Sequence, residues 1–318
     1  MKKILVCILC LLTFGINSGV YAQRSSNGFT ANTIAETYFY LLGQSLSIQM
    51  YLDRDPNNQE LLTLKKDEAS YFGSTRDRMR AYLVNNLGES KFSEDEKSIL
   101  SILNDSNNKF EFNVETLKSD FQGILDHMKT VPEDYKYVIL SFKYQNNLSD
   151  LIRDNYYYTF NSKGHSKAKE IDFSIKVPVL FKATEGDSPN VVQNFKSYLG
   201  NNVISFNVVA QNVAGIGKPK KNEVLELIRS GEYKKIMSPN SKDVKVNHFA
   251  IGDFNGIKYN YSLEEQKMKS IQYMLFLENK VLLFTYAVRG LDNFDEESFD
   301  ESSFNAYVSS IMNTLVIN

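Results

Sequence analysis

The sequence is poor in the residues that build thiol chemistry and metal sites. Its 318 residues include two cysteines, three histidines and no tryptophan. The cysteines are Cys7 and Cys10, and the histidines are scattered at positions 127, 165 and 248. This supply excludes a disulfide framework and gives none of the spacings typical of a zinc site. We therefore expect no disulfides, no cofactor and no metal centre.

An excess of either charge is also missing. The chain has 36 basic and 38 acidic residues, which gives a net charge of −2. A balance this close to neutral gives no reason to expect nucleic acid as a partner. The hydrophobic fraction of 42% and the charged fraction of 23% are those of an ordinary globular protein.

The first 22 residues have the three parts of a cleavable signal peptide. Lys2 and Lys3 precede an apolar run from Ile4 to Ile16, and Val20-Tyr-Ala22 offers a cleavage site. The alternative is a short buried helix. Cleavage after Ala22 would remove both cysteines and place the protein outside the cytoplasm, either in a periplasm or secreted. No later stretch approaches about 18 apolar residues, so we expect no transmembrane segment after the signal is removed.

Residues 23–160 have the apolar spacing of amphipathic helices. Thr33-Ile-Ala-Glu36 is a capping box that opens the first predicted helix, and Pro132 suits the first turn of the fifth, which runs through Ile152. The second, third and fourth are predicted from Leu61 to Gly88, from Ser93 to Leu103 and from Val114 to Met128. Packing these helices together predicts an all-α bundle.

The period changes after a polar, glycine-containing stretch at 161–169, which we interpret as a domain linker. Residues 170–318 then alternate as β-strands do, beginning with Ile171 to Val177. Further strands are predicted at 191–198, 203–210, 256–261, 270–277 and 281–288, with helices at 222–229 and near the C-terminus. Short turns join the last strands, so the sequence predicts an α+β fold: a helical bundle followed by an antiparallel sheet flanked by helices.

This second half resembles the PsbP-like α/β/α sandwich of extracytoplasmic and photosystem-associated proteins. The resemblance covers about residues 170–318 and lies in the opening strand Phe173-Ser-Ile-Lys-Val-Pro178, a middle helix, the strand entry Asn255-Gly-Ile-Lys-Tyr259, a long hairpin and a final helix. Many members have a tryptophan shortly after the proline, and here Phe181 is the nearest aromatic residue. The resemblance implies a mostly non-enzymatic binding or accessory scaffold, without catalytic residues to carry over.

Motifs of catalysis and ion binding are incomplete. The stretch from Ala214 to Lys218 lacks the first glycine and the Ser or Thr of a phosphate-binding loop, and Ser45 lacks the second glycine of a nucleophile elbow. The acidic run Asp292–Glu301 is either a solvated loop ahead of the last helix or a calcium site. Catalytic residues are therefore not assigned.

Two features remain as candidates for binding a partner. The first is a basic span that contains Lys218, Lys220, Lys221, Lys234 and Lys235, which suits an anionic surface unless it is simply solvated. The second is Tyr157, within a run of aromatic residues too close in sequence to share one core.

These observations favour an exported, non-catalytic binding or accessory protein of the cell envelope or exterior. Its partner would be a protein or another envelope component. The alternatives are a secreted hydrolase with a dispersed site and a structural surface protein.

Overall fold

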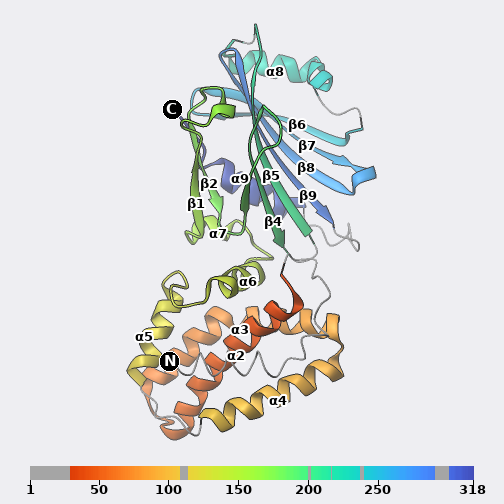
Figure 1. Cartoon of the computed structure of the whole chain (residues 1–318). Coiled ribbons are helices and arrows are strands. Elements are labelled where there is room, and N and C mark those ends of the chain that lie inside the picture. Colours follow the sequence, from red (N-terminus) through yellow and green to blue (C-terminus); the bar gives the residue numbers. More distant parts are fainter. Residues whose placement is uncertain (1–28, 108–113, 200–201, 216, 237–239, 291–300) are drawn as a thin grey trace. The chain divides into compact units, whose positions relative to one another are not determined.

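The protein folds as two compact units, one ending at Lys143 and the other beginning at Tyr144 (Figure 1). The computed structural model describes residues 29–107, 114–199, 202–215, 217–236, 240–290 and 301–318. The first unit is helical and the second combines antiparallel sheets with helices, which confirms the α+β class. The predicted signal peptide and the acidic run, apart from Glu301, lie outside the described residues.

Local signals set the ends of the helices in the first unit. Thr30 caps the first helix by accepting a hydrogen bond from Thr33 N–H at 3.1 Å, so this helix begins slightly before the predicted capping box. Asn58 caps the second in the same way, and Gly88, at φ 86°, ends it. The helices are α2 (Ala31–Arg54), α3 (Gln59–Leu87), α4 (Glu89–Asn107), α5 (Val114–Leu125) and α6 (Glu133–Lys143).

A polar network joins three of these helices. Arg80 of α3 pairs with Glu89 at 3.1 Å and with Glu96 at 3.2 Å, both on α4. Glu96 also accepts a hydrogen bond from the Tyr38 hydroxyl of α2. Burial is the main cause that raises the pKa of Tyr38, so its hydroxyl stays protonated and serves as a donor.

A buried ion pair lies within α3. Glu68 is 1% exposed, and its carboxylate pairs with the guanidinium of Arg76, two helical turns further along. Desolvation lowers the pKa of Arg76, which is the expected effect of burying a cation. Because each charge has lost most of its water, each depends on the other for compensation.

The second unit contains two antiparallel sheets. The smaller sheet has the order β1-β2-β10 and the larger one the order β3-β4-β5-β9-β8-β7-β6. The bounds in the smaller sheet are β1 (Tyr157–Asn161), β2 (Phe173–Pro178) and β10 (Val316–Ile317). Those in the larger sheet are β3 (Lys182–Glu185), β4 (Val191–Leu199), β5 (Asn202–Asn212), β6 (Lys242–Ile251), β7 (Phe254–Leu263), β8 (Met268–Leu277) and β9 (Lys280–Gly290).

The main core of this unit fills the space between the two sheets. The helix α9 (Glu301–Met312) and the inward face of β2 pack against one face of the larger sheet, as Figure 1 shows. Aromatic rings make many of the contacts: Phe206 stacks on Tyr286 at 4.3 Å, and Phe173 meets Phe284 edge-on at 5.7 Å. The alternation of apolar and polar residues that predicts β2 therefore corresponds to side chains that are alternately buried and half-buried along most of the strand.

A smaller core lies on the opposite face of the larger sheet. The helix α8 (Lys221–Arg229) packs on β6 and β7, with Val224 buried against Ile257 and Tyr259. Its polar residues lie on the side away from the sheet, which is the arrangement expected of a surface helix.

The boundary between the two units lies earlier in the chain than the predicted linker at 161–169. The predicted fifth helix continues through Ile152, whereas α6 ends at Lys143 and the polar turn 145–149 follows. After the short helix α7 (Asp150–Arg153), the chain forms β1 within the second unit. Residues 161–169 therefore connect two paired strands, β1 and β2, rather than two domains.

The buried ion pair leads to a stability prediction. Glu68→Gln removes one charge and leaves Arg76 without compensation, so we expect the free energy of unfolding to fall by about 3 kcal/mol. Urea denaturation followed by circular dichroism measures the change. The double variant Glu68→Leu with Arg76→Met removes both charges and is expected to lose less than the single variant.

The exposed pair of Lys118 with Glu60, 2.9 Å apart in the same unit, provides the control. Lys118→Ala is expected to change stability by less than about 1 kcal/mol. Equal losses for Glu68→Gln and Lys118→Ala would show that burial gives the first pair no special importance.

Candidate functional site

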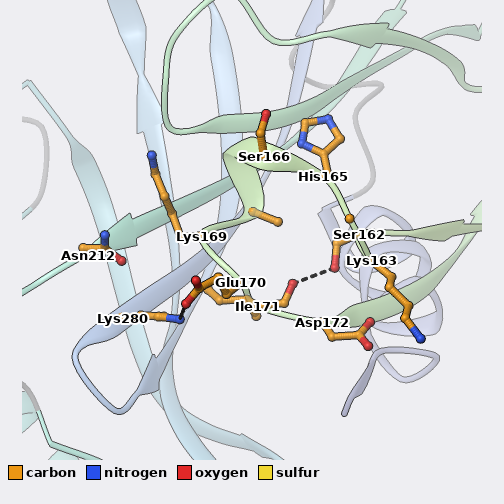
Figure 2. Close-up of a pocket in the computed structure, with 12 residues that line it drawn as sticks. Ser162, Lys163, His165, Ser166, Lys169, Glu170, Ile171, Asp172, Asn212 and Lys280 are labelled. Carbon is orange, nitrogen blue, oxygen red and sulfur yellow. Dashed lines mark hydrogen bonds and ion pairs between the residues drawn. The ribbon is translucent and has the colours of Figure 1, made fainter.

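A polar pocket of about 580 Å³ opens where the two sheets of the second unit meet. One wall is the connection between β1 and β2, and the other is formed by Asn212 at the end of β5 and Lys280 at the start of β9 (Figure 2). The volume lies in the range of small-molecule sites. The lining residues on the β1–β2 connection are Ser162, Lys163, Gly164, His165, Ser166, Ala168, Lys169, Glu170, Ile171 and Asp172.

A buried serine holds this connection in place. Ser162 is 1% exposed and donates its hydroxyl proton to the Ile171 carbonyl at 2.7 Å, the bond dashed in Figure 2. The same hydroxyl accepts the Phe173 N–H at 2.8 Å. The Ser162 side chain thus ties one end of a loop of about ten residues to the other end, and it satisfies two buried backbone groups.

The loop backbone adopts an uncommon conformation beside the pocket. The histidine His165 caps a short 3-10 helix, Ser166–Ala168, by accepting the Lys167 N–H on Nδ1 at 3.3 Å. A ring that accepts a hydrogen bond on Nδ1 carries its proton on Nε2. The next two residues, Lys169 and Glu170, are both left-handed, with φ of 53° and 60°. Residues other than glycine adopt this conformation at a cost of about 1–2 kcal/mol each.

The charges around the pocket are only partly paired. Lys280 Nζ lies 3.5 Å from a carboxylate oxygen of Glu170. The ammonium groups of Lys163 and Lys169 have no ion-pair partner among the described residues, and neither has the carboxylate of Asp172. Two cations and one anion thus remain to be compensated, which gives the pocket an excess of positive charge.

A second pocket, of about 280 Å³, differs in this respect. It lies where α9 meets β6, β7 and β8, and most of its polar groups bind one another, although the buried Ser270 hydroxyl has no hydrogen-bond partner. Lys245 pairs with Glu301 at 3.3 Å, Asn260 bonds Asn305 at 2.9 Å, and Ser262 bonds an Asp243 carboxylate oxygen at 2.8 Å. Because the charged groups that pair here offer a ligand little, the larger pocket, with its unpaired lysines, is the candidate site.

The basic span surrounds α8 and lies outside the candidate site. Lys220 caps the helix through its backbone N–H, which donates to Glu223, and Lys221 is the first helical residue. Lys218 lies 4.0 Å from Asp253 and 4.4 Å from the centre of the Phe254 ring. Lys234 and Lys235 belong to the 3-10 helix Glu232–Ile236, which contacts α8.

The other predicted binding residue is on a different element. Tyr157 is half-buried on β1, and the ammonium of Lys176 from β2 lies 4.1 Å from the centre of its ring. The structure therefore does not bring Tyr157 together with the lysines of the basic span, and all six residues stay predictions as partner contacts.

The remaining histidines have structural contacts. His248 Nε2 lies 2.9 Å from the Asn255 side-chain oxygen, and the amide of Asn255 donates to the Pro219 carbonyl just before α8. His127 has a left-handed backbone and lies beside Asp126. Within the described ranges, no cluster of His, Cys, Asp and Glu suits a metal ion, and no helix is long and apolar enough to span a membrane.

The comparisons with known proteins give distant structural neighbours. No family model, PsbP-like or other, matches the chain, and no curated protein matches it either. A crystal structure from Bacteroides thetaiotaomicron has a TM-score of 0.27 at 13% identity, over 46% of this chain and 45% of that one. LpqN of Mycobacterium tuberculosis, described as involved in cell envelope biogenesis, has a TM-score of 0.32 at 16% identity, over 54% and 97%. Likeness at this level carries no argument about function.

The buried serine gives a prediction for the loop. Ser162→Ala leaves the Ile171 carbonyl and the Phe173 N–H without their partner, so the free energy of unfolding is expected to fall by about 1–3 kcal/mol. Thermal and urea unfolding measure it. Ser166→Ala, an exposed serine four residues along the same loop, is the matched control and is expected to change stability by less than about 0.5 kcal/mol. A Ser162→Ala protein as stable as the control would contradict the anchoring role.

The left-handed residue gives a second prediction. Lys169→Gly relieves the backbone strain and is expected to raise the free energy of unfolding by up to about 1 kcal/mol. Ser166→Gly, in the right-handed turn just before, is expected to lower it by about 0.5–1 kcal/mol. Opposite signs in urea denaturation would support the strained conformation, whereas a loss of stability in both variants would count against it.

Proposed function

We propose that this chain is an exported, non-catalytic binding protein of the cell envelope or exterior, and that its second unit binds a small anion in the pocket between the sheets. The observation that carries the proposal is the pair of lysines, Lys163 and Lys169, that line the pocket without ion-pair partners among the described residues. Unpaired cations beside a cavity of ligand size are the usual way in which proteins attract a carboxylate or a phosphate.

Neighbouring groups add hydrogen-bond donors of the right kind. The Nε2–H of His165, the Ser166 hydroxyl and the Asn212 amide all belong to lining residues. The strained pair Lys169–Glu170 is consistent with a site held ready for a ligand, because such strain often persists at binding sites.

The export half of the proposal rests on the sequence. The signal peptide would deliver the protein outside the cytoplasm, and the PsbP-like order of elements in residues 170–318 favours an accessory scaffold over an enzyme. The larger partner of such a protein would be another envelope component, and the lysines around α8 are the surface that we propose for that contact.

The anion proposal predicts binding that depends on two lysines. Isothermal titration calorimetry with inorganic phosphate and with glutarate is expected to show binding that weakens as salt is added. The double variant Lys163→Gln with Lys169→Gln is expected to bind at least about tenfold more weakly, since it removes both lysines of the lining that have no ion-pair partner among the described residues.

Lys182→Gln is the matched control. It removes one exposed lysine from β3 in the same unit, away from the pocket, and is expected to leave the affinity unchanged. Failure of both anions to bind the wild-type protein, or equal binding by the double variant, would refute an anion site here.

A further inference from the structure

We infer that the junction of α2, α5 and α6 in the helical unit is pH-dependent: it is more stable when Glu36 and Asp120 are protonated and less stable when both are charged. The inference concerns the first unit alone and does not depend on the anion pocket. It rests on carboxyl and hydroxyl groups that meet at this junction without a cation from the described residues.

Two tyrosines form the buried part of the junction, where α2 packs on α6. Tyr40 of α2 is 2% exposed and Tyr135 of α6 is 6% exposed, and the centres of their rings are 5.5 Å apart. The Tyr40 hydroxyl is shielded from solvent and has no hydrogen-bond partner in the part of the chain that the structure describes. Burial raises the pKa of both tyrosines, to about 12 for Tyr135, so both hydroxyls stay neutral.

Glu36 brings the first carboxyl group to these tyrosines. It lies one helical turn before Tyr40, on the same face of α2, and its side chain is half-buried. Desolvation is the main cause that raises the pKa of Glu36, and the nearby charge of Asp134 adds to the effect. A hydrogen bond from the Tyr135 hydroxyl offsets only part of it. The fold therefore favours the protonated form of Glu36.

Asp120 of α5 brings the second carboxyl group. It lies close enough to Tyr40 for its charge to be one of the causes that raise the pKa of that tyrosine. Its Oδ2 atom is shielded from solvent and has no hydrogen-bond partner among the described residues. Desolvation raises the pKa of Asp120 as well. A buried carboxylate oxygen without a donor is costly, and a proton on Asp120 removes the charge that makes it so.

The basic groups of the neighbouring helices act elsewhere. No described lysine or arginine is among the groups that shift the pKa of Glu36 or Asp120. Lys118, which is also on α5, pairs with Glu60 at 2.9 Å. The charged groups of α3 and α4 that act on α2 do so at Tyr38, and they are Arg76, Arg80 and Glu96.

The direction of the pH effect follows from these two pKa values. A carboxyl group whose pKa is raised by folding binds its proton more tightly in the folded chain than in the unfolded chain. The stability that it contributes is present below its ordinary pKa of about 4, and it is lost as the pH rises through the pKa in the folded chain. Mild acidification therefore strengthens the junction.

Isosteric amides test the inference in the full chain without the predicted signal peptide. Glu36→Gln combined with Asp120→Asn removes both charges. At pH 7.5 it is expected to raise the ratio of folded to unfolded helical unit at least about threefold over the wild type. At pH 4.5 the gain is expected to fall below about 1.5-fold, because the wild-type carboxyl groups then carry protons. Urea unfolding followed by the helical circular dichroism signal measures both ratios.

Two other acids of the same unit serve as controls. Asp67→Asn removes an exposed carboxylate from α3 and is expected to leave the ratio unchanged. Asp126→Asn removes a carboxyl group whose pKa is lowered, mainly by the hydrogen bond from Lys129 at 2.6 Å, and it is expected to give no gain. A gain for Asp67→Asn equal to that of the double variant would assign the effect to the net charge of the unit and overturn the inference.

Two further results would also overturn it. One is a double variant that is no more stable than the wild type at pH 7.5, and the other is an equal gain at both pH values, which a titrating group does not produce. If the double variant does not fold, Glu36→Gln and Asp120→Asn are measured singly, and each is expected to give part of the gain. Carbon-13 NMR titration of the two wild-type carboxyl groups is expected to place both pKa values above their ordinary range.

Discussion

Much of the second unit depends on two of the hydrogen bonds of the Ser162 hydroxyl, one to the Ile171 carbonyl and one from the Phe173 N–H. They join the end of β1 to the start of β2, and so they fix where β2 begins. Because side chains alternate along a strand, a shift by one residue would turn Phe173 and Ile175 out of the core and turn polar neighbours in. The same two bonds define the loop that lines the pocket. The packing of the core and the shape of the site therefore share one anchor.

The sequence predicts the regular parts of the fold because their apolar periods are clean. The strands β7, β8 and β9, the helix α8 and the helices α2 and α3 all lie close to their predicted ranges. Four strands escaped prediction: the short β3 and β10, and also β1 and β6, for which the physical reasons are clear. The aromatic run at 156–160 continues an amphipathic pattern, so β1 looks like the end of a helix. The lysines at 242 and 245 make β6 look like part of a solvated basic span, although it is an edge strand on which charged residues are usual.

The site was harder to predict than the fold because its residues carry the signals of a loop. Glycine, serine and lysine at 161–169 are typical of a linker, and only the structure shows that Asp172 and Lys280, more than a hundred positions apart, line one pocket. Charge density along the sequence pointed instead to α8, where Lys218 lies 4.0 Å from Asp253 and none of the lysines of the basic span lines the pocket. The packing of the two sheets, rather than the number of lysines in a segment, decides which lysines border a cavity of ligand size.

The pocket takes its walls from both sheets of the second unit, which otherwise hold together through apolar packing. A bound ligand would act as a polar cross-link between the two sheets. Its binding free energy would add to the free energy needed to separate them on unfolding. At a free concentration of one hundred times the dissociation constant, that contribution is about 2.7 kcal/mol, a large share of the stability of a typical domain. The lifetime of the protein against proteolysis would then depend on how much of its ligand is present.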